Sequence, residues 1–149
     1  DIVSAARLAN EEGQAAEGKK TFTKVTKEDE QKEAISSKQV SISFRSGEYK
    51  LDANAKTIID LQFADIARTF SNARIRIEGN TDNVGNANSN KKLSYLRAQS
   101  VAQSLQQEYG FDENRFVIVG NGSEKPVSDN STAAGRAENR RTDFELIAE

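Results

Sequence analysis

The segment GNTDNVGNANSNKKLSYLRA, residues 79–98, gathers an acid, several amides and an arginine in a short length of chain. A polar, glycine-containing loop that holds Asp82 runs into a helical pattern with Asn90 near its start. At about 100° per residue, Asn90 and Arg97 lie on one side of that helix, in line with the apolar Val101. The spacing therefore brings an anion, a cation and amide groups close together, a set that can bind a charged ligand.

Structural roles for these residues stay open at this point. Asparagine and glycine are ordinary turn and N-cap residues. Arg97 interrupts an apolar helix face, where it could extend its charged end to water or form a salt bridge with Asp82 that ties the loop down. Residue types and spacing alone do not separate a ligand site from a fastened loop.

Composition removes many chemistries. A chain of 149 residues with 36% hydrophobic and 30% charged residues suits one globular domain plus a polar extension. The net charge of −2 argues against a nucleic-acid partner. With no His and no Cys, zinc sites, Cys nucleophiles and Ser-His-Asp triads lack their parts. We therefore expect neither an enzyme nor a cofactor nor a metal site.

Short motif matches do not change this expectation. Residues 89–92 spell S-x-x-K and residues 128–130 spell S-D-N, but the third motif of penicillin-recognising enzymes, K-T-G, is missing. The glycines at 120 and 122 start neither of the common phosphate-binding loops. No apolar run approaches the roughly 20 residues of a membrane helix, so we expect no membrane insertion of this segment.

The chain divides into a polar part and a patterned part. Residues 1–37 hold few large apolar residues, which predicts a linker or the end of a preceding domain, helical in SAARLANEE and KEDEQKEA. Strand-like alternation and helical spacing then follow each other from residue 38 to residue 149. Strands are expected at 39–44, 73–79, 115–122 and 142–147, with helices after Asp52, across 90–109 and around 132–140. The order β-α-β-α-β-α-β predicts a sheet covered by one layer of helices.

Periodicity also predicts which side chains face the core. After an N-cap at Asp52, we expect the first helix to turn Ala55, Ile59, Phe63, Ile66 and Phe70 inward. In the long helix we expect Leu93, Ala98, Val101 and Leu105 inward, with Gly110 as the stop. Alternation in the last strand sends Arg141, Asp143 and Glu145 to one face, which leaves Arg140 as the arginine directed toward a site.

Several motifs together resemble a known family. TDNVG, Asn90, LSYLRAQSV, VGNGSEKP, DNST and GRAENRR resemble the OmpA-like C-terminal domain, the peptidoglycan-associated module also found in Pal lipoproteins and MotB-type stator proteins. The resemblance covers about residues 38–149 and implies an α+β, two-layer fold with a mixed sheet and helices on one face. It further implies non-covalent binding to the stem peptide of peptidoglycan through its diaminopimelate residue, in the periplasm of a Gram-negative bacterium. The parent protein would then be attached to the outer membrane or the cell wall.

The resemblance assigns roles to particular residues. Asp82 matches the aspartate that holds the diaminopimelate ammonium, and Arg97 matches the arginine that holds its carboxylate. Asn90 and Arg140 match positions that line the pocket, and Thr81 and Val84 belong to the same loop. The end of the diaminopimelate side chain is a zwitterion, so such a site needs an anion and a cation held apart, and arginine can give a carboxylate two parallel hydrogen bonds.

A second function remains an alternative. A stator or scaffold module would serve mainly for protein association, with wall binding secondary and a homodimer as a possible partner. A stable dimer in a sedimentation measurement would favour this alternative.

Overall fold

The computed structural model describes residues 25–31 and 39–148, and the predicted helix in SAARLANEE lies outside these ranges. The elements are α2 (Lys27–Gln31), β1 (Val40–Ser43), α3 (Ala53–Ile59), the π-helical η1 (Asp60–Ala64), α4 (Asp65–Thr69), β2 (Arg74–Gly79), α5 (Ala87–Tyr109), the 3₁₀ turn η2 (Glu113–Arg115), β3 (Phe116–Gly120), α6 (Ala133–Asn139) and β4 (Arg141–Ile147). From β1 onward, the predicted alternation of strands and helices is confirmed. The predicted caps are confirmed as well: Asp52 accepts a hydrogen bond from the backbone N–H of Ala55, and Gly110 ends α5 with φ of 69°.

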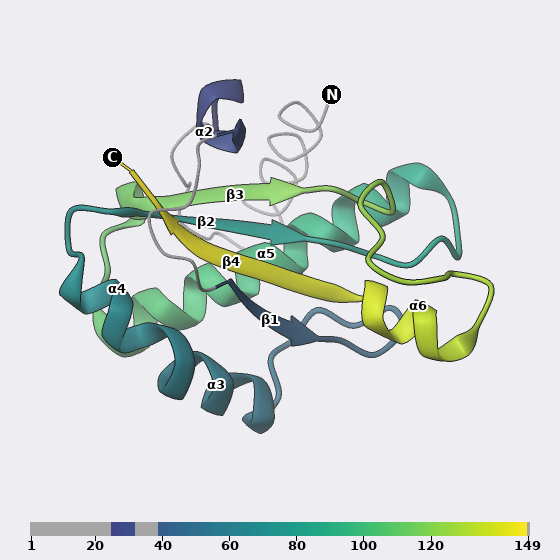
Figure 1. Ribbon diagram of the computed structural model, residues 1–149, viewed down its shortest axis with the longest axis horizontal. Helices are drawn as coiled ribbons and strands as arrows, with labels where there is room; N and C mark the ends of the chain where they lie inside the picture. Colours follow the sequence, from purple (N-terminus) through teal and green to yellow (C-terminus); the bar gives the residue numbers. More distant parts are fainter. Residues whose placement is uncertain (1–24, 32–38, 149) are drawn as a thin grey trace.

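The four strands form one mixed sheet in the order β1-β4-β2-β3 (Figure 1). β2 and β3 are parallel, whereas β4 is antiparallel to both of its neighbours, β1 and β2. β1, β2 and β3 therefore point the same way, and the start of β4 lies beside their ends. This edge of the sheet, called the carboxyl edge below, collects the loops that follow β1, β2 and β3 together with the end of α6.

The apolar core lies between the sheet and one layer of helices. Alternate residues of β2 and β4, among them Ile75, Ile77 and Phe144, are fully buried on this face. The ring of Phe63 meets the ring of Phe144 edge-on, with centroids 4.9 Å apart, which joins the first helical segment to the middle of the sheet. The α+β architecture with helices on one face is thus the predicted one.

The first helical segment differs from the expected apolar face. Ile66 is only half-buried and Phe70 is 51% exposed, whereas Ala64 and Ala67 are fully buried. The π-helical turn η1 between α3 and α4 explains the shift, because its wider turn adds a residue and rotates the following positions about the helix axis. The predicted inward positions are correct for Ala55, Ile59 and Phe63, Ile66 still packs against the core, and Phe70 is the position that was predicted wrongly.

Helix α5 lies unusually close to the end of β2. A Cβ at Gly79 would stand 1.7 Å from the carbonyl oxygen of Ser94, so only glycine permits this approach. Ala98, Val101 and Leu105 are fully buried as predicted, whereas Leu93 is half-buried and Tyr95, 3% exposed, joins the core instead. The close contact places the first half of α5 directly over the carboxyl edge.

Charged side chains occupy the second face of the sheet. Arg74 and Arg76 alternate with the core residues of β2 and face away from α5. α2 forms part of the helix predicted in KEDEQKEA and packs on this face. Nη1 of Arg74 lies 2.8 Å from Oδ2 of Asp29, and Arg76 donates to the carbonyl of Glu30.

No helix within the described residues is long and apolar enough to cross a membrane.

Candidate ligand-binding site

Three charged side chains converge at the carboxyl edge from different elements. Asp82 comes from the loop after β2, Arg97 from the middle of α5, and Arg140 from the residue that joins α6 to β4. We call Asp82, Arg97 and Arg140 the ligand-end cluster. Two features bring these elements together. Gly79 lets α5 pack closely against the end of β2, and the antiparallel direction of β4 makes this strand begin beside the end of β1.

Asp82 is paired with Arg140. Oδ2 of Asp82 lies 3.0 Å from Nη1 of Arg140, and Oδ1 accepts a hydrogen bond of 3.1 Å from the backbone N–H of Val84. The two side chains are 9% and 19% exposed, so the pair lies just beneath the surface. A carboxylate offers about four lone-pair positions. Asp82 therefore keeps acceptor capacity for a ligand ammonium.

Arg97 is fully buried and bonds to backbone carbonyls instead of Asp82. Its Nη1 donates to the carbonyl of Asn80 at 2.9 Å. Its Nε and Nη2 donate to the carbonyls of Glu48 and Arg45, at 2.8 and 3.1 Å. The predicted alternative of a salt bridge between Arg97 and Asp82 is not what the structure contains, although Arg97 does fasten the loop after β1 to the loop after β2.

The charge of Arg97 is only partly compensated. Burial lowers the pKa of Arg97 to about 10, while nearby Asp82 raises this pKa and Arg140 lowers it. The guanidinium remains charged at neutral pH, but the shift shows that its surroundings stabilise the charge less well than water does. The ligand-end cluster holds two cations and one anion, an imbalance that favours binding of a further negative group.

The other predicted residues lie in or beside the loop that holds Asp82. Asn90 donates from Nδ2 to the carbonyl of Val84 at 3.1 Å, which holds the loop against α5. Thr81 is 3% exposed and its hydroxyl donates to the carbonyl of Asp82 at 2.8 Å. The side chain of Val84 is 60% exposed and lies at the rim. Asn90, Thr81 and Val84 are thus gathered around Asp82.

Sequence reasoning missed the contribution of β1. The carbonyl of Phe44 accepts a hydrogen bond of 3.0 Å from Nε of Arg140, and the ring of Phe44 lies 5.2 Å from the guanidinium carbon of Arg97. Together with the carbonyls of Arg45 and Glu48, Phe44 forms one side of the site. Because carbonyl groups belong to every residue, only the tertiary placement of β1 next to β4 identifies them.

Arg141 faces the opposite side of the sheet, as alternation predicted. Its Nε lies 3.0 Å from Oδ2 of Asp143, and its Nη2 donates to the carbonyl of Lys125. Consecutive arginines therefore have separate roles: Arg140 belongs to the ligand-end cluster, and Arg141 holds the loop after β3 against the sheet.

Comparison with known proteins identifies the class to which this arrangement belongs. The sequence pattern of the OmpA family matches residues 43–140, and the chain belongs to that family. It is 39% identical over 111 residues to outer membrane porin F of Pseudomonas aeruginosa, an alignment that covers 74% of this chain and 31% of the porin. It is 46% identical over 76 residues to the outer-membrane lipoprotein YfiB of the same species, covering 51% of this chain and 45% of the lipoprotein. The chain thus spans less than half of these relatives.

Solved structures agree with the family assignment. The peptidoglycan-associated lipoprotein of Burkholderia pseudomallei matches with a TM-score of 0.64 and 29% identity, covering 72% of this chain and 87% of that chain. The cell wall anchor of the type VI secretion system (T6SS) of Pseudomonas aeruginosa matches with a TM-score of 0.63 and 34% identity, covering 74% and 81%. The C-terminal domain of Helicobacter pylori MotB shares the fold, with a TM-score of 0.66 at 22% identity. The chain is thus a domain of the OmpA family, and the proteins it is similar to include an outer membrane porin, an outer-membrane lipoprotein and a peptidoglycan-associated lipoprotein.

Proposed function

We propose that this domain binds peptidoglycan non-covalently through the diaminopimelate of the stem peptide and so anchors its parent protein to the cell wall in the periplasm. One observation carries the proposal: at the carboxyl edge, the carboxylate of Asp82 lies near the two arginines Arg97 and Arg140. A zwitterion whose ammonium and carboxylate share one carbon fits such a cluster, because each of its charges meets the opposite charge.

In this proposal Asp82 holds the ammonium. Its carboxylate is already aligned by the N–H of Val84 and by Arg140, so it loses little side-chain freedom on binding. Arg140 pairs with Asp82 and remains partly exposed, at the rim of the site.

Arg97 holds the ligand carboxylate. Since the guanidinium is fully buried under the turn at residues 45–48, the carboxylate replaces a backbone carbonyl of that turn when it binds. A charged acceptor in place of a neutral one gives a stronger hydrogen bond, which supports the exchange. Thr81, Asn90 and Val84 keep the loop in position around both charges.

Ligand selectivity tests the proposal. Lysine has the ammonium of diaminopimelate but lacks the carboxylate assigned to Arg97, so lysine-type stems leave the buried guanidinium without its anion. We expect lysine-type muropeptides to bind more weakly by about 2–3 kcal/mol, roughly 30- to 150-fold. Calorimetry with matched diaminopimelate-type and lysine-type muropeptides measures the difference. Equal affinities would show that the carboxylate is not recognised.

A further inference from the structure

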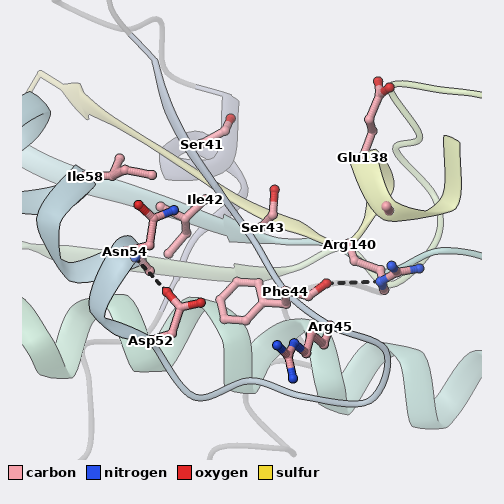
Figure 2. A pocket seen from close by; sticks show the side chains of 12 residues that line it. Ser41, Ile42, Ser43, Phe44, Arg45, Asp52, Asn54, Ile58, Glu138 and Arg140 are labelled. Atoms are coloured by element: carbon pink, nitrogen blue, oxygen red, sulfur yellow. Dashed lines mark hydrogen bonds between the residues drawn. The ribbon is translucent and has the colours of Figure 1, made fainter. Parts of the chain in front are cut away.

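A hollow lies beside the outer strand β1 and ends at the ligand-end cluster. Its volume is about 420 Å³, and its walls are β1 with the two following residues, the first turns of α3 and the end of α6. Figure 2 shows Arg45 and Arg140 on one side of Phe44, and Asn54 and Ile58 on the other. Because Arg140 also pairs with Asp82, the hollow continues from the proposed diaminopimelate site along β1. We call it the β1 groove.

The free edge of β1 faces this groove with backbone groups that point away from β4. The N–H of Phe44 donates to the carbonyl of Arg140 at 2.9 Å, so Phe44 is one of the residues whose backbone points toward β4. In an antiparallel pair this direction alternates, which turns the N–H and C=O groups of Ser41 and Ser43 away from β4. Among residues 25–31 and 39–148, none bonds these groups, and both serines line the groove.

The side chains of the groove are mixed in character. Arg45 is exposed and supplies a positive charge at the end next to the ligand-end cluster, while Ile58 gives an apolar wall at the other end. The carboxylates of Asp52 and Glu138 also line the groove. The strand is only four residues long, so its free edge offers few pairing positions. These features suit a short peptide with a carboxylate near one end better than a long partner strand.

We propose that the β1 groove binds the remainder of the stem peptide, with its amide groups on the free edge of β1 and the carboxylate of the residue before diaminopimelate on Arg45. This inference rests on the proposed function, since the diaminopimelate group must first be held at the ligand-end cluster. In such stems the preceding glutamate is joined through its side chain, which leaves its main-chain carboxylate free. An outer strand readily accepts an extended peptide, and an arginine binds a carboxylate with a charge-assisted hydrogen bond.

The substitution Arg45→Gln tests the charge without disturbing the fold. The side chain of Arg45 is exposed, and the backbone carbonyl that accepts from Arg97 is unchanged by the substitution. We expect Arg45→Gln to bind the tripeptide alanyl-glutamyl-diaminopimelate about tenfold more weakly than wild type does, and to bind a tripeptide whose glutamate carboxylate is amidated no more weakly than wild type does. Wild-type protein should lose a similar factor when the free glutamate carboxylate of the tripeptide is amidated. Lys50→Gln, an exposed cation in the same loop outside the groove, is the matched control and should change neither affinity.

The free edge is tested by Ser43→Pro, which removes an N–H that points away from β4. Proline is tolerated at such a position on an outer strand. Weaker binding of the tripeptide with unchanged binding of free diaminopimelate would support the proposal. Equal tripeptide affinities for wild type, Arg45→Gln and Ser43→Pro would overturn it.

Two further outcomes separate the possible failures. If free diaminopimelate does not bind, or binds equally well to Asp82→Asn, the proposed function fails rather than the groove alone. If sedimentation shows a wild-type dimer that Ser43→Pro converts to monomers, the groove is a contact between two copies of the chain, and the peptide proposal is wrong.

Discussion

The domain buries arginines at two places, and the two places balance charge differently. On the second face of the sheet, Arg76 contacts the carboxylate of Glu145, and Arg74 contacts Asp29. We call Asp29, Arg74, Arg76 and Glu145 the outer-face cluster. It holds equal numbers of acids and bases, each within reach of a partner, so an added ligand would gain little there.

The ligand-end cluster lacks this balance. Arg140 pairs with the carboxylate of Asp82, whereas Arg97 is bonded to three backbone carbonyls and to no carboxylate. A charge that is paired with an opposite charge serves the structure, whereas a buried cation without a bonded anion favours a negative group of a ligand. Substitutions in the first cluster should therefore affect stability, and substitutions in the second should affect binding.

The largest effect is expected at Asp82. Asp82→Asn keeps an oxygen for the N–H of Val84 but removes the anion that balances Arg140 and to which we assign the ligand ammonium. Binding to purified peptidoglycan should weaken by about 2–4 kcal/mol, because two cations then meet the ligand ammonium without a counter-charge.

Co-sedimentation with peptidoglycan measures this loss. Glu145→Gln, the equivalent change in the outer-face cluster, serves as the control and should sediment with the wall like wild type. Wild-type binding by Asp82→Asn would remove Asp82 from the site.

Arg97→Lys should have the next largest effect on binding. A lysine ammonium keeps the charge but cannot bond a carboxylate with two parallel N–H groups while it also reaches the carbonyls of Asn80 and Glu48. We expect a loss of about 2–3 kcal/mol for diaminopimelate-type muropeptides in calorimetry. Arg141→Lys, on the opposite face, should leave the affinity unchanged, and equal losses in both variants would point to a general effect on the fold.

Much of this fold could be predicted because local signals agree with tertiary packing. Alternation along β2 and β4 places Ile75, Ile77 and Phe144 in the core, and the cap at Asp52 marks the start of α3. The prediction was wrong at Phe70, because the π-helical turn η1 changes the phase of the helix without a clear sequence signal.

The site could be predicted less completely. The family motif assigns ligand contacts to the side chains of Asp82 and Arg97, and the same motif gives Arg140 as a pocket residue. Neither the motif nor residue spacing shows that Arg140 pairs with Asp82, or that Arg97 bonds to the loop after β1. These contacts join residues more than 45 positions apart in sequence, so they depend on how β1, β4 and α5 meet.

An intermediate effect on stability is expected at Arg76. Arg76→Gln leaves the buried carboxylate of Glu145 without its cation and removes the hydrogen bond to the carbonyl of Glu30. The free energy of unfolding should fall by about 2 kcal/mol, while the affinity for muropeptides stays at the wild-type value. Denaturant titration gives the first quantity and calorimetry the second. A loss of binding at unchanged stability would contradict the division between the two clusters.

The smallest effect concerns the contact between α2 and the sheet. The polar composition of residues 1–37 predicts a segment that adds little to the domain, yet Asp29 is 2.8 Å from Arg74 and Val25 packs against a small apolar cluster that includes Val117 and Val119. A double-mutant cycle with Asp29→Asn and Arg74→Gln isolates the ion pair, whose side chains are 10% and 16% exposed. We expect a coupling free energy of about 0.5–1 kcal/mol, because the cost of removing both charges from water offsets much of their attraction.

Removal of residues 1–31 extends this test to the whole contact. The truncated domain should lose about 1 kcal/mol of stability, since the ion pair and the packing of Val25 are lost together while the core between sheet and helices is untouched. Its affinity for muropeptides should not change, because α2 lies on the face opposite α5, away from Arg97. A zero coupling energy together with unchanged stability would show that α2 does not hold this position in solution. A loss of muropeptide binding would instead mean that the second face of the sheet influences the ligand-end cluster, and the two clusters would then have to be treated as one unit.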